Sequence, residues 1–283
     1  MEEKVIDLYT YFNVPRKGET CGTLKAIRHG YLSEMGIHRI RPAMLVIPGG
    51  GYAFVSQREA DPIAHEYFSQ GFDCFVLDYD VAPAHHYPTP ILQAGMAMLY
   101  LRREAAALDL DENHIAAVGF SAGGHLCGCI SLLWDDPALR QLFGAECEKI
   151  RPDASIYAYP VVTSDARYAH GDSFVNLCGD RAKIEDYSLE KKVRVGASPS
   201  FIWSTTTDLA VPVENSLLLY RSLHEAGASV ELHVFESGPH GMSCCNAEVT
   251  GQAEPDAELR HVRNWLPLSF EFLKTHGFQI KMA

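Results

Sequence analysis

The sequence lacks most of the features that mark membrane, secreted or nucleotide-binding proteins. No apolar run reaches membrane-spanning length. The first residues include two acids, Glu2 and Glu3, and are not followed by the apolar segment that is typical of a secretory signal. Neither G-x-x-x-x-G-K-[ST] nor G-x-G-x-x-G is present, which disfavours a phosphate-cradling loop. No cluster of Lys and Arg offsets the net charge of -12, which argues against a nucleic-acid partner.

The sequence also lacks the paired C-x-x-C spacing of a zinc site, although it contains eight cysteines. The nearest approaches are Cys244-Cys245 and Cys127-x-Cys129. Cys74 and the pair at 127 and 129 lie in apolar segments, where a thiol acts as a small hydrophobe. We therefore expect reduced cysteines, no bound metal and a cytoplasmic location.

Strand-like and helix-like segments alternate along the whole chain of 283 residues, with no repeat and no low-complexity linker. The central apolar segments are short and alternate little, which is typical of a parallel sheet covered on both faces by helices. The first two strand-like segments alternate more and are expected to form an antiparallel edge. Residues 1–283 are thus predicted to form one α/β domain with a mostly parallel sheet. The expected strands are residues 4–12, 22–28, 43–47, 73–77, 115–119, 155–159, 200–204 and 230–235, and the expected helices are residues 59–70, 91–108, 122–134, 214–226 and 257–275.

Residues 163–197 interrupt this alternation with a polar segment that contains Gly171 and Gly179. The segment lies between two predicted strands, where an insertion would rise above the carboxyl ends of the sheet. We expect a small cap or a substrate-facing loop there.

Ser121 lies in the G-x-S-x-G pentapeptide GFSAG, between an apolar β-prone segment and an apolar helix-like one. A strand that turns sharply into a helix through a serine is the nucleophile elbow of an α/β-hydrolase. The small neighbours let strand and helix approach closely, and the helix N-terminus directs free N–H groups toward developing negative charge. The pattern predicts a nucleophile at Ser121 and an oxyanion donor at Ala122; the alternative is a plain glycine-rich turn.

A nucleophilic serine needs a histidine base, and the base needs an acid that orients it. In α/β-hydrolases the acid and then the histidine follow the nucleophile along the chain. Asp208 follows the predicted strand at 200–204, and His240 follows the predicted strand at 230–235 in the turn-rich segment ESGPHG. We predict that Asp208 and His240 complete a catalytic triad with Ser121.

Other histidines and acids are weaker candidates for the triad. His233 lies in the middle of a predicted strand, and His125 lies in the helix after the elbow, so both are expected to be structural. The acids of the 163–197 segment lie away from the predicted strand ends: Asp165, Asp172 and Asp180.

The glycine-rich loop PGGGY follows the predicted strand at 43–47. Three glycines allow the main chain to approach a substrate carbonyl without a Cβ in the way. We expect the remaining oxyanion N–H groups to come from this loop.

Several motifs together resemble the acetyl-xylan-esterase-like, BD-FAE-type branch of the α/β-hydrolases, which are bacterial carbohydrate esterases. The motifs extend from about Arg41 to about Gly241 and are PGGGY, SQREADPIA, LDYDVAPAHHYPTP, GFSAGGH, SPSFIWSTTTDLAVPVENS and FESGPHG. The resemblance implies the α/β-hydrolase fold and the triad named above. It also implies oxyanion donors at Gly50, Gly51 and Ala122, and removal of short acyl groups, commonly O-acetyl, from plant-type oligosaccharides.

The chain departs from the wider hormone-sensitive-lipase group in one position of the glycine-rich loop. That group has a histidine before its three glycines, whereas this chain has Pro48, which cannot make the loop-fixing hydrogen bonds of a histidine. Ser56, Arg58 and Glu59 are candidate anchors for the loop. The alternative is that the two charged residues form a solvated pair.

The predicted activity is ester hydrolysis through an acyl-enzyme, with no cofactor and no metal. Tyr52, Tyr79 and His86 are the predicted substrate-binding residues, because their rings suit the apolar faces and hydroxyl groups of a sugar. The expected partner is a small ester, chiefly an acylated sugar, with no nucleic acid and no membrane, and a homodimer is compatible with the sequence. The alternatives are an amidase or formamidase, a small aryl esterase, and a non-catalytic binding module on the same fold.

Overall fold

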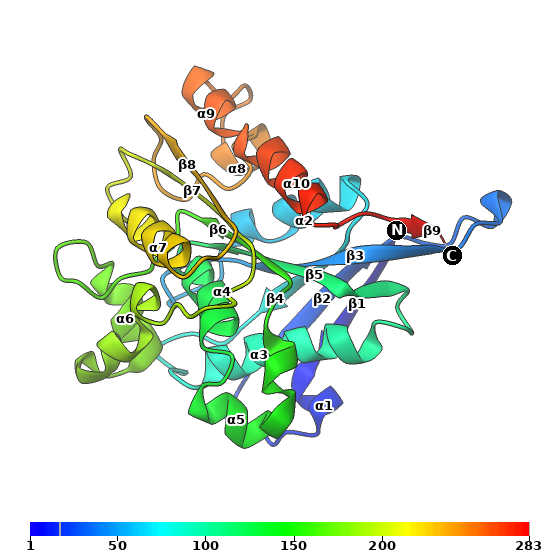
Figure 1. Ribbon diagram of the computed structural model, residues 1–283, viewed down its shortest axis with the longest axis horizontal. Coiled ribbons are helices and arrows are strands. Elements are labelled where there is room, and N and C mark those ends of the chain that lie inside the picture. Colours follow the sequence, from blue (N-terminus) through cyan, green and yellow to red (C-terminus); the bar gives the residue numbers. More distant parts are fainter. Residues whose placement is uncertain (17, 283) are drawn as a thin grey trace.

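A mostly parallel sheet forms the centre of the computed structural model, which describes residues 1–16 and 18–282 (Figure 1). Its strands are β1 Glu2–Asp7, β2 Thr23–Arg28, β3 Arg39–Ile47, β4 Asp73–Asp78, β5 Leu110–Phe120, β6 Ala154–Ala158, β7 Ser200–Thr205, β8 Val230–Phe235 and β9 Lys281–Met282. The strand order is β1-β2-β4-β3-β5-β6-β7-β8, and β9 pairs with β3. Strand β2 pairs antiparallel with both β1 and β4, and β4 to β8 form the parallel part together with β3. The predicted antiparallel edge and parallel centre are confirmed.

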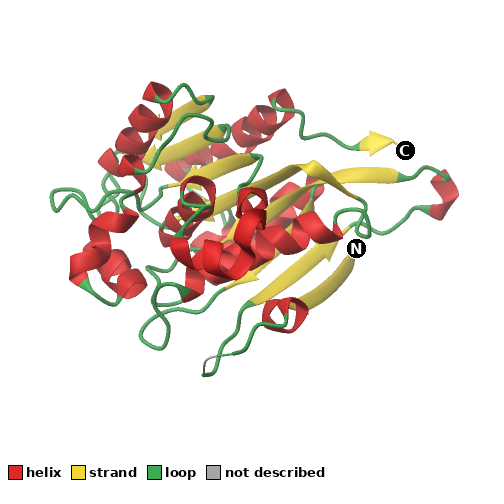
Figure 2. Cartoon of the chain, turned by 60° about the horizontal axis from the view of Figure 1, so that its bottom comes forward, coloured by secondary structure: helices red, strands yellow, loops and turns green. Residues whose placement is uncertain are grey.

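Helices cover both faces of the sheet (Figure 2). They are α1 Leu8–Phe12, α2 Asp61–Ser69, α3 Thr89–Glu104, α4 Ala122–Leu132, α5 Pro137–Phe143, α6 Gly171–Cys178, α7 Glu214–Glu225, α8 Ala247–Thr250, α9 Ala257–Val262 and α10 Trp265–Thr275. Along β3, Ala43 and Leu45 belong to the core shared with α3, α4 and α7, whereas Met44 and Val46 belong to the core shared with α2, α9 and α10. Successive residues of a strand therefore fill two separate cores, as expected for a sheet buried on both sides.

Short 3-10 helices occupy several of the connections. They are η1 Ser33–Met35, η2 Gln57–Glu59, η3 Gly144–Ile150, η4 Arg181–Tyr187 and η5 Leu189–Lys191. The last two lie in the predicted insertion at residues 163–197, together with α6. The insertion is therefore a chain of short helical segments that precedes β7.

Two predicted elements are divided in the structure. The predicted strand at 4–12 ends at Asp7, whose carboxylate accepts a hydrogen bond from Thr10 N–H at 3.0 Å and caps α1. The predicted helix at 257–275 is interrupted between α9 and α10. Pro267 lies in the first turn of α10 and has no N–H to continue a hydrogen-bond ladder from α9, which explains the break.

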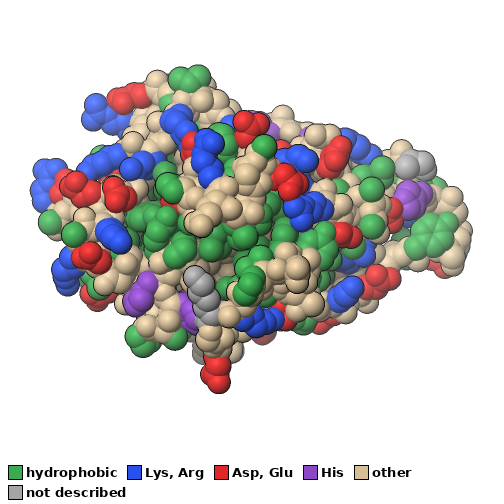
Figure 3. Space-filling model, turned by 90° about the horizontal axis from the view of Figure 1, so that it is seen from below, with side chains coloured by type: hydrophobic (Ala, Val, Ile, Leu, Met, Phe, Trp, Pro, Cys, Tyr) green, Lys and Arg blue, Asp and Glu red, His purple; other side chains and the backbone are tan. Residues whose placement is uncertain are grey.

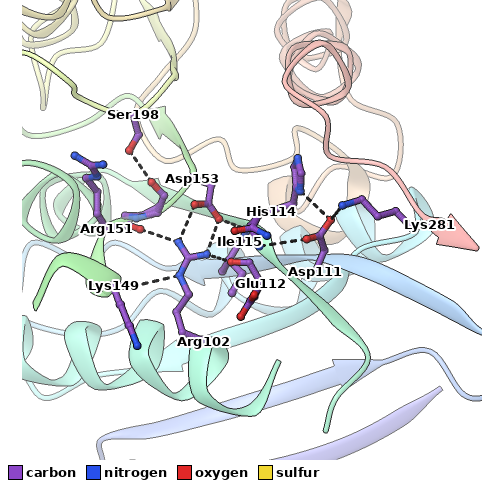
Figure 4. A network of polar contacts seen from close by, with 12 residues as sticks. Arg102, Asp111, Glu112, His114, Ile115, Lys149, Arg151, Asp153, Ser198 and Lys281 are labelled. Carbon is purple, nitrogen blue, oxygen red and sulfur yellow. Dashed lines mark hydrogen bonds and ion pairs between the residues drawn. The ribbon is translucent and has the colours of Figure 1, made fainter. Parts of the chain in front are cut away.

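A network of polar contacts holds the end of the sheet opposite to Ser121 (Figure 4). Arg102 of α3 donates to both carboxylate oxygens of Asp153, at 2.7 and 2.9 Å. Asp153 in turn accepts from Ile115 N–H at 2.7 Å, and Arg102 also donates to the carbonyl oxygen of Arg151 at 2.9 Å. These bonds join α3 to the chain at β5 and before β6. Strands β5 and β6 are parallel, so their carboxyl ends lie together at the opposite end of the sheet, where the candidate site is found.

Candidate active site

Ser121 occupies the sharp turn between β5 and α4, with a left-handed φ of 53° and ψ of -119°. Few non-glycine residues adopt such a backbone, and they concentrate at functional sites. A Cβ at Gly119 would lie 2.3 Å from the carbonyl oxygen of Gly123, and a Cβ at Gly123 would lie 2.2 Å from that of Ile47. Both positions therefore require glycine, and the G-x-S-x-G pattern follows from the packing of this turn.

A continuous hydrogen-bonded chain joins the three predicted triad residues. His240 Nε2 lies 2.8 Å from Ser121 Oγ, and His240 Nδ1 lies 2.6 Å from Asp208 Oδ2. An ionised carboxylate can only accept, so the proton on Nδ1 is directed to Asp208 and Nε2 is left to accept from the serine hydroxyl. The structure thus brings together the three side chains in the geometry of a serine nucleophile, its base and an orienting acid.

Two loops fix the acid and the base. Asp208 is 5% exposed, and its Oδ1 accepts from the N–H groups of Ala210 and Val211, both at 2.9 Å. The second oxygen is therefore the one left for His240. The ring of Tyr159 packs edge-on against the His240 ring, with centroids 4.9 Å apart. These contacts leave the imidazole little freedom to turn away from Ser121.

Glu59, one of the three candidate anchors, holds the glycine-rich loop. Its Oε2 accepts from Gly49 N–H at 2.8 Å, and its Oε1 accepts from the Tyr159 hydroxyl at 2.7 Å. Burial and then the Glu59 charge raise the pKa of Tyr159 well above its usual value, so the phenol remains a donor. Glu59 is only 3% exposed, so the alternative of a solvated pair with Arg58 is wrong.

The N–H groups of the predicted oxyanion donors remain available. Gly49 N–H is used by Glu59, whereas among residues 1–16 and 18–282 no acceptor is found for the N–H groups of Gly50, Gly51 or Ala122. Gly50 has φ 120°, and a Cβ there would lie 2.0 Å from the carbonyl oxygen of Phe54. The loop can therefore pass close to the nucleophile only with glycine at this position.

Replacing Glu59 with alanine should lower kcat about 10²-fold for a small ester, because the oxyanion loop loses the bond that fixes Gly49. The free energy of unfolding in urea should also fall by about 2 kcal/mol, since the N–H of Gly49 loses its acceptor and the Tyr159 hydroxyl, which still accepts from Ser243 N–H, loses the acceptor for its own proton. Glu236→Ala is the matched control, because Glu236 is exposed in the loop after β8. A folded Glu59→Ala protein with kcat within about threefold of wild type would contradict the anchoring role.

The triad opens into a pocket of about 340 Å³. Ser121 and His240 line it together with the glycine-rich loop, Arg58, Phe54 and three residues of the insertion, which are His170, Asp172 and Asn176. The insertion therefore contributes three side chains to the pocket, and the sequence could not identify which residues these are. In the sequence, the insertion is marked only by its polar composition between two predicted strands.

A second hollow lies on another face of the molecule, where Figure 3 shows apolar side chains gathered at the centre of the view from below. It measures about 440 Å³ and is lined by residues of α1, α3 and α5, among them Tyr9, Leu92 and Leu142. His85 lines this groove, but its Nε2 lies 2.7 Å from the Glu19 carbonyl oxygen rather than near a hydroxyl nucleophile. The pocket of about 340 Å³ is therefore the one that contains a nucleophile and its base.

None of the three predicted substrate-binding residues lines the pocket, which corrects that prediction. Tyr52 and Tyr79 are each 1% exposed. The Tyr79 hydroxyl donates to the Pro48 carbonyl oxygen at 2.7 Å, and the Tyr52 hydroxyl lies 2.9 Å from His125 Nδ1. His86 packs beside Gly179 and its Nδ1 lies 2.6 Å from the Asn176 carbonyl oxygen. Both tyrosine side chains are therefore buried in the protein, where their hydroxyl groups hold the glycine-rich loop in place, and neither lines the pocket.

The two histidines predicted to be structural occupy structural positions. His125 is buried beneath the loop, with Nε2 2.7 Å from the Tyr187 carbonyl oxygen, and burial lowers its pKa to about 4. The neutral imidazole of His125 therefore links α4 to Tyr52 on one side and to Tyr187 of the insertion on the other. His233 lies 2.6 Å from Glu231 on β8, away from the triad.

Within residues 1–16 and 18–282, no group of three or more His, Cys, Asp or Glu side chains is placed to hold a metal ion. All eight cysteines are free. Across the same residues, no helix combines the length and apolarity needed to cross a membrane.

The chain is similar to a known protein family and to two curated proteins, a xylanase and an acetylxylan esterase. Residues 31–166 match the BD-FAE family. An endo-1,4-beta-xylanase B of Butyrivibrio fibrisolvens is 36% identical over 74% of this chain, and an acetylxylan esterase of Xylanibacter ruminicola is 30% identical over 79%. The chain spans only 33% and 45% of the lengths of these two relatives.

A solved structure matches along almost the full chain. An acetyl ester-xyloside bifunctional hydrolase from Caldicellulosiruptor lactoaceticus is 28% identical, with a TM-score of 0.79 and coverage of 97% of both chains.

Proposed function

This chain belongs to the BD-FAE-type family of α/β-hydrolases, and from that premise we propose that it is a carboxylic ester hydrolase. It removes short acyl groups, chiefly O-acetyl, from a carbohydrate through an acyl-enzyme on Ser121. The observation that carries the proposal is the hydrogen-bonded chain from Ser121 through His240 to Asp208, which lies beside unpaired N–H groups.

The first half of the reaction transfers the acyl group to the enzyme. His240 Nε2 takes the Ser121 proton as Oγ attacks the ester carbonyl carbon. The carbonyl oxygen becomes an oxyanion, and the N–H groups of Gly50, Gly51 and Ala122 stabilise it. The bond to the alcohol then breaks, and the imidazolium returns the proton to the leaving alkoxide. Asp208 accepts the hydrogen bond from His240 Nδ1–H throughout and stabilises the imidazolium.

The second half releases the acid. A water molecule takes the place of the alcohol and gives a proton to His240 as it attacks the acyl carbon. The same N–H groups stabilise the second oxyanion, and the proton passes from His240 to Ser121 Oγ as the ester bond to the enzyme breaks. The products are a carboxylic acid and the regenerated hydroxyl, and no cofactor takes part.

The surroundings of Ser121 favour a short acyl group and a polar alcohol. The pocket is small, and the polar side chains of Arg58, His170, Asp172 and Asn176 are part of its lining. Phe54 lines the pocket and is 60% exposed, so its ring is available to stack on the apolar face of a sugar. The names of two similar proteins, an acetylxylan esterase and an acetyl ester-xyloside bifunctional hydrolase, also support a short acyl group on a sugar.

Acyl chain length separates a sugar deacetylase from a lipase. Across p-nitrophenyl esters of two to ten carbons, kcat/KM should be highest for acetyl or propionyl and at least about 10-fold lower for octanoyl. A methylene gains up to about 0.8 kcal/mol only where an apolar pocket accepts it, and here longer chains meet polar side chains. Initial rates of nitrophenol release give the series directly. A maximum at eight carbons or longer would contradict the sugar-ester proposal and favour a lipid or aryl esterase.

A further inference from the structure

His170 is a second histidine in the lining of the catalytic pocket, and the mechanism above does not use it. It directly precedes α6, within the insertion, and lines the pocket with Ser121 and His240. Its ring lies against the oxyanion loop, because a Cβ placed on Gly51 would lie 3.9 Å from His170 Cε1. The side chain therefore borders the space that an ester bound to Ser121 must occupy.

The His170 ring is held in a fixed orientation. Its Nδ1 lies 2.8 Å from Ser173 Oγ, and the N–H of Ser173 donates to the His170 carbonyl oxygen at 3.1 Å. Ser173 is 1% exposed, so its hydroxyl is a buried and well-defined partner. One turn later Asn176 donates to the Gly51 carbonyl oxygen at 2.9 Å and ties α6 to the oxyanion loop. The position of His170 is consequently coupled to that of the reacting carbonyl group.

The other ring nitrogen has no protein partner. Among residues 1–16 and 18–282, no hydrogen bond to His170 Nε2 is found, although the residue is only partly exposed. Burial, and then the charge of His240, lower the pKa of His170 below its ordinary value, while Asp172 and Asp208 act in the opposite direction. At neutral pH the ring is therefore uncharged and offers one polar atom to the pocket.

A hydroxyl group is the ligand that fits this nitrogen best. If Nδ1 accepts from Ser173, Nε2 carries the proton and donates; if Nδ1 donates, Nε2 accepts. A hydroxyl can serve as acceptor or donor and so matches either tautomer, whereas a carbonyl or an ammonium group matches only one. His170 and His240 line the same pocket, and His240 is the group that returns a proton to the leaving alcohol, so we expect the alcohol part of the ester to face His170.

We propose that His170 is a specificity-determining residue whose Nε2 hydrogen-bonds a free hydroxyl on the alcohol part of the ester, next to the acylated oxygen. The enzyme then prefers acetyl esters of polyhydroxylated alcohols over acetyl esters that carry no hydroxyl. This inference rests on the proposed ester hydrolysis and adds to it the residue that recognises the sugar.

Two substrates and two amide variants of His170 test the proposal. The substrates are a mono-O-acetylated methyl xyloside, which keeps free hydroxyls beside the ester, and p-nitrophenyl acetate, which has none. In His170→Asn the amide reaches only the position of Nδ1 and can keep the contact with Ser173. In His170→Gln the longer side chain places its amide near the position of Nε2. His65→Asn, at an exposed position of α2 outside the pocket, is the matched control.

The measured quantity is the ratio of kcat/KM for the xyloside acetate to kcat/KM for p-nitrophenyl acetate. We expect His170→Asn to lower this ratio about 10-fold or more, mainly through KM, and His170→Gln to restore part of it. An equal loss on both substrates, or an unchanged ratio, would overturn the role of His170. Wild-type protein that hydrolyses neither ester would instead contradict the proposed function, and hydrolysis of p-nitrophenyl acetate alone would overturn the recognition of a sugar.

Discussion

Ser121→Ala is expected to lower ester hydrolysis by about 10³-fold or more while leaving the fold intact. The change removes one oxygen atom, and alanine introduces no new atom at the crowded turn between β5 and α4. The lost oxygen is the nucleophile, so neither the base nor the oxyanion N–H groups can replace it. The measurement is kcat/KM for p-nitrophenyl acetate, with circular dichroism and thermal unfolding to establish that the protein is folded.

Ser164→Ala is the matched control for the loss of a serine hydroxyl. Ser164 lies in the insertion, and its buried hydroxyl has no hydrogen-bond partner among residues 1–16 and 18–282. Its removal should leave kcat/KM close to the wild-type value. Substantial activity in a folded Ser121→Ala protein would show that the nucleophile is another group.

Asp208→Asn should lower kcat about 10⁴-fold, through the tautomer of His240. Asp208 Oδ1 is already held by the N–H groups of Ala210 and Val211, and an asparagine would keep its oxygen there. The amide nitrogen would then face His240 Nδ1 and donate to it. The imidazole must respond by carrying its proton on Nε2, where Ser121 requires an acceptor.

Asp180→Asn provides the comparison within the insertion. Asp180 caps η4 by accepting from Ala182 N–H at 2.9 Å and does not line the pocket. Its substitution should change kcat by less than about threefold, since an asparagine also caps helices. If Asp180→Asn had the larger effect, the orienting acid would lie in the insertion, and the assignment of Asp208 would be wrong.

The parts of the site that depend on local geometry could be predicted from the sequence. The turn at Ser121 needs small neighbours on both sides, and that steric demand leaves the G-x-S-x-G pattern. Asp208 and His240 each follow a short apolar strand, and parallel strands bring their carboxyl ends to one edge of the sheet. Residues that are far apart in the chain could therefore be placed together before any coordinates were known.

The parts that depend on packing could not be predicted in this way. Tyr52 follows the glycine-rich loop in the sequence, but its left-handed φ of 56° and its bond to His125 direct it into the core. Glu59 was one of three candidate anchors, and only its burial against Gly49 and Tyr159 distinguishes it. His170 lies in a segment without strong periodicity, so its approach to the oxyanion loop depends on the tertiary contact made by Asn176.

Covalent trapping of the nucleophile tests the central claim most directly. Diethyl p-nitrophenyl phosphate reacts with an activated serine, which displaces nitrophenolate and retains the diethylphosphoryl group. The intact mass of the wild-type protein should increase by one such group, and peptide mapping should place it on Ser121, with no adduct in Ser121→Ala and slow labelling in Asp208→Asn. An active protein that gains no adduct, or gains it on another residue, would contradict the proposed acyl-enzyme.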